Sequence, residues 1–251
     1  GGSIVLDRAA NFAAGRAIEY DGPAIRCMPV PSRAVLANLT AELGATAVFG
    51  PVDQQLLAYV ARAGSPVAWT SRFSVDKDAS YDRVITFDAG KEIAEPLIAS
   101  IALEDEVQPL SKWESAEINM AVLGGCVNGR LEDLEMAARI LAGRKVHSGV
   151  RLLVIPASQR VILDALHLGY LQELVAAGAL LSPPACGLPS GMPGAAVADG
   201  ETVIASVTRE YFGEEDVRNA RIFLTSPAVV AASAVAGRVV HPEDVMEESV
   251  A

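Results

Sequence analysis

The sequence predicts an α/β fold of two lobes, each an α/β/α arrangement around a largely parallel, doubly wound sheet. In its second half, short apolar runs alternate with stretches of helical periodicity, which is typical of parallel strands joined by crossover helices. Hydrophobic residues make up 51% of the chain but aromatic ones only 5%, a composition that suits helices packed on a buried sheet. The 251 residues suffice for two lobes, and we place their boundary near Gln108, between residues 1–108 and 109–251.

The first lobe is predicted to alternate helices and strands. One helix is expected over residues 33–43, with Ser32 as its N-cap and Gly44 just past its end. A second helix is expected over residues 52–63. Short apolar runs predict strands at residues 46–49, 67–70 and 83–87.

The second lobe has the clearer pattern. Helices are expected over residues 131–141 and 157–177, and a third begins at Pro227, because proline suits the first helical position. Strands are expected at residues 118–123, 151–155, 179–181, 202–205 and 221–224. This order predicts a parallel sheet with right-handed crossovers.

Charge and cysteine content exclude several classes of protein. The formal net charge of -11 disfavours a nucleic-acid backbone or an anionic membrane surface as the partner. No apolar stretch reaches the roughly 18 residues that a membrane span needs. Three cysteines are too few, and odd in number, for a disulfide scaffold. We therefore expect a cytoplasmic protein without nucleic-acid or membrane partners.

Three segments with small and polar residues follow predicted strands, at residues 124–130, 183–191 and 206–213. In an open α/β sheet, ligands gather outside the carboxyl ends of the strands, and glycines let the backbone approach them. The sequence therefore predicts a ligand site at this edge. The residues alone leave two alternatives for each candidate: Cys126 and Cys186 are buried small side chains or site residues, and Asn128 is a helix cap or a ligand.

The order and spacing of these segments resemble the aconitase superfamily, especially the isopropylmalate isomerase (3-isopropylmalate dehydratase) large subunits. Gly124-Gly-Cys-Val-Asn-Gly-Arg130 is similar to that family's G-S-C-T-N-G-R. Residues 33–45 are similar to its R-M-x-x-x-N-M-x-x-E-x-G-A, and Pro51-Val-Asp53 to its P-D-E turn. The resemblance covers nearly the whole chain and implies aconitase-like α/β domains.

The resemblance also implies a [4Fe–4S] cluster that three cysteines hold, one in the first segment and two in a C-G-x-C pair. Cys126 and Cys186 stand at two of the ligand positions, but Pro189 stands at the third and cannot bind iron. Cys27 lies in a segment where the family has no ligand. The implied ligand set is incomplete, and the alternatives are no metal or a different one.

The resemblance implies a site for a small hydroxy-carboxylic acid as well. It implies catalytic roles for Asn38 and Glu42, and substrate contacts for Arg33, Asn128, Arg130 and Arg209. The planar guanidinium of Arg209 suits a bidentate grip on a carboxylate. In the family's S-N-R-N-F-x-G-R segment, Thr208 replaces the first Asn and Glu214 the second Arg. A carboxylate there repels an anionic substrate by about 1 to 4 kcal/mol at a few ångströms.

Together these features predict part of an aconitase-type hydro-lyase that acts on a small hydroxy-carboxylic acid. The resemblance implies that a missing N-terminal domain and a small swivelling subunit complete it. The alternatives are a cluster-free relative that serves as a binding or regulatory subunit, and a cluster-free hydro-lyase for another small acid. The two departures at Pro189 and Glu214 favour the binding or regulatory subunit.

Overall fold

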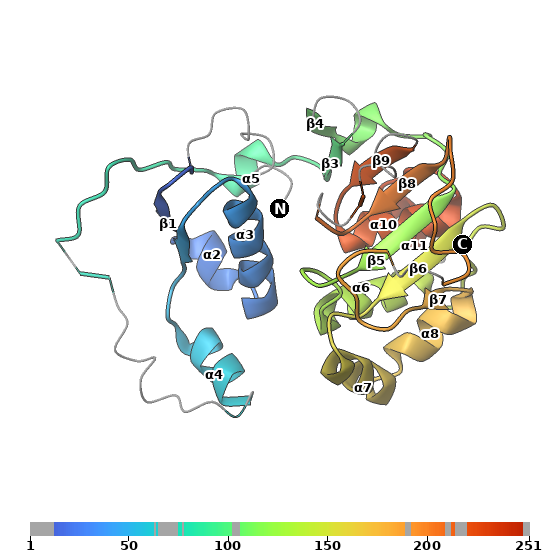
Figure 1. The fold of residues 1–251 in the computed structure, drawn as a ribbon, viewed down its shortest axis with the longest axis horizontal. Coiled ribbons are helices and arrows are strands. Elements are labelled where there is room, and N and C mark those ends of the chain that lie inside the picture. Colours follow the sequence, from blue (N-terminus) through green and yellow to red (C-terminus); the bar gives the residue numbers. More distant parts are fainter. Residues whose placement is uncertain are drawn as a thin grey trace. The chain divides into compact units, whose positions relative to one another are not determined.

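The computed structural model describes residues 13–62, 64, 75–76, 78–101, 106–188, 192–208, 212–213 and 220–247. Two compact units are present: an N-terminal unit, Asp7–Ala94, and a C-terminal unit formed mainly by Glu95–Ala251 (Figure 1). The units divide the chain near Glu95 rather than near Gln108, because residues 97–109 form two strands that extend the sheet of the C-terminal unit.

The N-terminal unit contains two short parallel strands with helices around them. Its elements are β1 (Ala17–Glu19), α2 (Pro23–Cys27), α3 (Val30–Glu42), β2 (Ala47–Phe49), α4 (Gln54–Arg62) and α5 (Ala89–Glu92). β1 pairs in parallel with β2, so α2 and α3 form the connection between two parallel strands. The predicted helices at 33–43 and 52–63 and the strand at 46–49 are confirmed as α3, α4 and β2.

Two predictions for this unit are wrong. Helix α3 begins at Val30 with Pro29 at its N-cap, so Ser32 lies inside its first turn. Residues 83–87 are not a strand: they are irregular, and Val84 and Ile85 are 76% and 60% exposed. A β-branched run forms a strand only where a neighbouring strand pairs with it and a core covers one face. The strand expected at residues 67–70 lies outside the described residues.

The C-terminal unit is built on a seven-stranded sheet with the order β4-β3-β9-β8-β5-β6-β7. The five strands from β9 to β7 are parallel. At the β9 edge, β3 pairs antiparallel with β9, and β4 pairs antiparallel with β3. The strands are β3 (Leu97–Ser100), β4 (Glu106–Pro109), β5 (Met120–Gly124), β6 (Arg151–Ile155), β7 (Leu180–Leu181), β8 (Thr202–Ala205) and β9 (Arg221–Leu224). The mostly parallel α/β sheet predicted for this half is confirmed.

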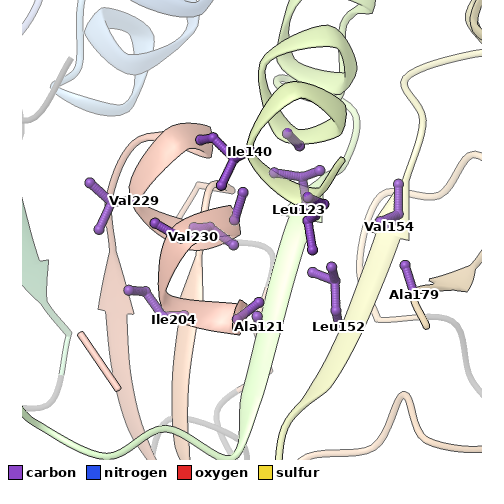
Figure 2. Close-up of a cluster of buried hydrophobic side chains, with 14 of the residues drawn as sticks. Ala121, Leu123, Ile140, Leu152, Val154, Ala179, Ile204, Val229 and Val230 are labelled. Carbon is purple, nitrogen blue, oxygen red and sulfur yellow. The ribbon is translucent and has the colours of Figure 1, made fainter. Parts of the chain in front are cut away.

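Helices cover one face of this sheet. They are α6 (Leu131–Leu141), α7 (Gln159–His167), α8 (Tyr170–Ala177), α10 (Pro227–Ala236) and α11 (Pro242–Glu247). The single helix expected over residues 157–177 is divided in two, because Gly169 adopts a left-handed conformation (φ 82°) that ends α7 and precedes α8. Figure 2 shows Leu123 and Leu152 of the strands in one buried cluster with Ile140 of α6 and Val230 of α10.

The other face is covered by irregular segments in the part of the chain that the structure describes. Ala195 and Met192, between β7 and β8, and Phe212, between β8 and β9, pack with Met120 and Val122 of β5. The strand order reverses after β7, and a right-handed connection that runs in the reverse direction must cross the opposite face. The connections therefore wind on both faces, as predicted, but among the described residues helices cover only one face. In the same described residues, no helix is both long and apolar enough to cross a membrane.

Candidate functional site

The strand order changes direction at β5, which lies between β6 and β8. The chain leaves the carboxyl end of β5 toward β6, and the carboxyl end of β8 leads toward β9 on the other side. Connections that diverge in this way leave a crevice at the edge of an open α/β sheet, where ligands bind. The segments after β5 and β8, which the sequence singled out, meet there.

The segment after β5 passes directly over the end of β6. The backbone N–H of Gly125 donates to the carbonyl of Ile155 at 2.8 Å. A Cβ atom at Gly124 or Gly129 would lie 2.1 or 2.3 Å from that carbonyl oxygen, and both glycines have positive φ (111° and 69°). No other residue fits these two positions without displacing backbone, so the glycines hold residues 124–130 close to the sheet.

Ser206 joins the ends of β5 and β8. Its hydroxyl accepts a hydrogen bond from the backbone N–H of Gly124 at 3.1 Å, and its carbonyl accepts one from the side-chain amide of Asn128. Ser206 is only 1% exposed, so these bonds are made away from solvent. Sequence reasoning named this segment but not Ser206 as a positioning residue. The available signal was a hydroxyl residue placed directly after the apolar residues 203–205 of β8.

Helix α6 begins directly after this loop, with Arg130 as its N-cap. The cap interpretation of Asn128 is therefore wrong: its amide instead connects the two loops. The Arg130 Nε donates to the carbonyl of Val127 at 3.1 Å, and its backbone N–H donates to the Asp133 carboxylate at 3.0 Å. Burial raises the pKa of Asp133 above its ordinary value, since a buried carboxyl favours its neutral form.

The structure brings Cys126 and Cys186 together. Their Sγ atoms are 2.9 Å apart although the residues are 60 positions apart in the chain. Both side chains are exposed, so the alternative of two buried small side chains is wrong. Partial burial, and then the hydrogen bond with Cys186, raise the pKa of the Cys126 thiol. Cys27, which is also exposed, belongs to helix α2 of the N-terminal unit.

This donor set does not fit a [4Fe–4S] cluster. Two thiolates on one tetrahedral metal, with bonds of about 2.3 Å, lie about 3.8 Å apart, and thiolates on different irons of a cluster lie farther apart still. The separation of 2.9 Å between Cys126 and Cys186 is shorter than either. Among the residues that the structure describes, no group of three or more His, Cys, Asp and Glu side chains could hold a metal ion. Pro189, at the third ligand position, lies outside them.

The remaining predicted site residues divide between the N-terminal unit and the undescribed part of the chain. The Arg33 guanidinium donates to the carbonyls of Met28 and Arg26, each at 2.9 Å, and pairs with the Asp53 carboxylate at 2.8 Å. These contacts tie the start of α3 to the residues before α4, and the Arg33 bond holds the pKa of Asp53 below its usual value.

Asn38 is exposed on α3, and Glu42 follows one helical turn later. Arg209 lies outside the described residues. The structure thus brings together Cys126, Cys186 and Asn128 with Arg130 near the edge of the larger sheet, whereas Arg33, Asn38 and Glu42 belong to the N-terminal unit.

Comparison with known proteins gives consistent matches over the whole chain. A model of the aconitase family (aconitate hydratase) matches residues 4–100 and 91–237. The 3-isopropylmalate dehydratase large subunit 2 of Archaeoglobus fulgidus is 38% identical over 241 residues, which cover 96% of this chain and 57% of that protein. The 3-isopropylmalate dehydratase large subunit of a Hydrogenobaculum species is 40% identical, with coverage of 93% and 54%.

A second activity appears among the relatives. The 2,3-dimethylmalate dehydratase large subunit of Eubacterium barkeri is 35% identical over 230 residues, which cover 91% of this chain and 54% of that protein. The chain spans a little more than half the length of the curated relatives that it matches.

Proposed function

The chain belongs to the aconitase family, and on that premise we propose that it is part of a hydro-lyase acting on a small hydroxy-carboxylic acid. The loop of residues 124–130 carries this proposal, because it crosses the switch point of the sheet and leads into the N-terminus of α6. Substituted malates are named in the relatives' activities, which supports a small hydroxy acid as the ligand.

Positive charge and oriented N–H groups are the features that would hold the acid. The partial positive charge of a helix N-terminus favours an anion, and α6 is long enough, at 11 residues, to have a substantial dipole. Arg130 stands at that end of the helix. Arg209 is proposed as a second carboxylate contact, because a guanidinium can bind a carboxylate through two parallel hydrogen bonds.

Dehydration of a hydroxy acid removes a proton from one carbon and a hydroxyl group from the next. It therefore needs a base, an acid and a positive environment for the charge that develops on the carboxylate. We propose Glu42 as the proton-transferring group and Asn38 as a hydrogen-bonding residue beside it. Since Cys126 and Cys186 do not fit the family's cluster, no step of this proposal uses one.

Further parts are required for the complete activity. The matched residues make up 54–57% of the relatives, which are named large subunits. We propose that an additional N-terminal domain and a small swivelling subunit complete the enzyme, which acts in the cytoplasm.

A second candidate function is a cluster-free binding or regulatory subunit. The 2.9 Å separation of the two thiols favours it, and so do Pro189 at a ligand position and Glu214 at a carboxylate-binding position. In that case the chain binds a carboxylic acid without converting it.

The first test is calorimetric titration of the chain with 3-isopropylmalate and 2,3-dimethylmalate at low salt, with acetate as the monocarboxylate control. Loss of one charged hydrogen-bonding contact typically costs about 1.5–3 kcal/mol, so Arg209→Ala is expected to weaken binding roughly 10- to 100-fold. Arg160→Ala is the matched control: Arg160 is 82% exposed on α7, and its partner is Asp164 of the same helix.

Both acids binding no better than acetate would refute a carboxylate site at this edge. Equal effects of the two arginine variants would refute the role of Arg209. Addition of the small subunit of a relative then separates the two functions: dehydration of the bound acid supports the hydro-lyase, and binding without turnover supports the binding subunit.

A further inference from the structure

Two separate loops hold the Cys126 and Cys186 thiols in contact. Cys126 follows Gly124 and Gly125, whose positive φ and close approach to Ile155 determine the path of its backbone. Val127 is 8% exposed, so the loop is also anchored by a buried side chain on the far side of Cys126. The Sγ atom of Cys126 therefore has little freedom to move away from the edge of the sheet.

Cys186 is held from the other side. The segment that carries it continues from β7, where the backbone N–H of Ser182 donates to the carbonyl of Val154 at 2.9 Å. Ala185 and Leu188, on either side of Cys186, pack against the second core cluster. Packing of both loops thus sets the 2.9 Å contact between the sulfurs.

The distance between the two Sγ atoms is closer to that of a disulfide bond than to that of two metal-bound thiolates. A disulfide bond is about 2.05 Å long, so it forms here with an approach of about 0.9 Å between the Sγ atoms, whereas two thiolates on one metal must move apart to about 3.8 Å. Both thiols are exposed, so a small oxidant and a small reductant can reach them. Exposed thiols at this distance need only a small movement to form a disulfide, and exposure leaves that disulfide open to thiol–disulfide exchange.

We propose that Cys126 and Cys186 are a redox modification site that closes to a reversible disulfide, in place of the ligand role that the family assigns to these positions. This inference does not depend on carboxylate binding. The oxidant is hydrogen peroxide. One thiol attacks it, releases water and becomes a sulfenic acid, and the second thiol then attacks that sulfur and releases a second water. Two thiols lose two electrons and two protons, and the peroxide becomes two molecules of water.

Both thiols are exposed, so hydrogen peroxide can oxidise either sulfur to the sulfenic acid. The other sulfur, already in contact with it, then attacks that sulfur to form the disulfide. A dithiol reductant reverses the reaction by thiol–disulfide exchange. The disulfide joins the loop after β5 to the segment after β7, so oxidation restrains the edge of the sheet.

The test uses the whole reduced chain, treated anaerobically with one equivalent of hydrogen peroxide. Free thiols are then counted with a chromogenic disulfide, and linked peptides are identified by mass spectrometry. We expect two of the three thiols to be lost, a peptide that joins Cys126 to Cys186, and full recovery with dithiothreitol. Cys27 is the internal control, because it is also exposed but has no part in the pair.

Single variants define the pair. Cys27→Ala is expected to leave the crosslink unchanged. Cys126→Ala and Cys186→Ala each remove the partner thiol, so the remaining cysteine of the pair stops at the sulfenic acid, which a dimedone probe detects. Equal oxidation of all three cysteines without a 126–186 crosslink would overturn the proposal. Stoichiometric iron and sulfide after anaerobic reconstitution, lost in both Cys126→Ala and Cys186→Ala, would also overturn it, because the two residues would then be cluster ligands. Both readouts use the wild-type chain first, so they do not depend on the folding of a variant.

Discussion

The close passage of residues 124–130 over β6 can be tested with a matched pair of glycine substitutions. Gly129 and Gly143 have nearly the same positive φ, 69° and 70°. A Cβ atom at Gly129 would lie 2.3 Å from the carbonyl oxygen of Ile155, whereas one at Gly143 would meet nothing within 4 Å. Comparison of Gly129→Ala with Gly143→Ala therefore isolates the steric contact from the backbone conformation.

The expected loss of stability has two contributions, the left-handed backbone conformation and the steric contact with Ile155. A left-handed alanine costs about 1–2 kcal/mol, and the loss of glycine from the unfolded chain offsets about 0.4–1 kcal/mol of that. Gly143→Ala should therefore lower the free energy of unfolding by roughly 0–1.5 kcal/mol. Forcing an extra methyl group against packed backbone adds about 1–3 kcal/mol, which applies to Gly129→Ala alone.

Urea unfolding of the C-terminal unit measures this difference. Trp113 reports on that unit, because its ring lies 4.9 Å from that of Phe223 in the core. The chain has two tryptophans, so a Trp69→Phe background leaves Trp113 as the only one. Equal unfolding midpoints for the two alanine variants would show that the loop does not cross Ile155 at contact distance. That result would refute the geometry described for residues 124–130.

Three further predictions concern protonation and oxidation. Burial raises the pKa of Asp133 above its ordinary value of 3.8, so its contribution to stability is present at low pH and is lost as the pH rises through the raised pKa. Asp133→Asn should therefore gain stability relative to the parent as the pH rises above 3.8, and a pH-independent difference in urea unfolding would contradict this. The pKa of Asp53 is shifted in the opposite direction, because the hydrogen bond from Arg33 lowers it. The contribution of Asp53 to stability is therefore present above pH 3.8 and is lost as the pH falls. Asp53→Asn should reduce the acid dependence of amide exchange in α3. The disulfide closes a loop of 60 residues, and the chain-entropy relation predicts a stabilisation of at most about 4 kcal/mol for such a loop. Guanidinium unfolding of the oxidised and the reduced chain measures this difference. Cys126→Ala is the control variant, whose stability should not change on oxidation.

Much of the C-terminal sheet was predictable because its central strands are short, largely apolar runs. The run at residues 151–155 and the helical pattern at 131–141 are determined by local periodicity, and both match the structure within a residue. Strand β3 was missed because it pairs with β9, more than a hundred positions away in the chain. Strand β4 pairs in turn with β3, so it depends on the same contact. No local pattern reports such a contact.

The candidate site was predictable in its residue types but not in its geometry. The motif around Cys126 located the loop, and the second motif located Cys186. The bridge through Ser206 and the use of Arg33 as a tie between backbone carbonyls could not be read from the sequence. Each depends on which segments the fold places side by side, and a hydrogen-bonding residue has many alternative partners until the fold selects one.

By itself the sequence determined the family, the parallel α/β character of the second half and the need for glycine where the first loop turns. These are local or cumulative properties, set by side-chain periodicity and by the backbone freedom of single residues. Only the tertiary structure decided that the strand order reverses at β5, and that this reversal brings two cysteines 60 positions apart to a contact of 2.9 Å. The physical reason is that such a contact depends on strand order and on the packing of two loops, which many residues set together.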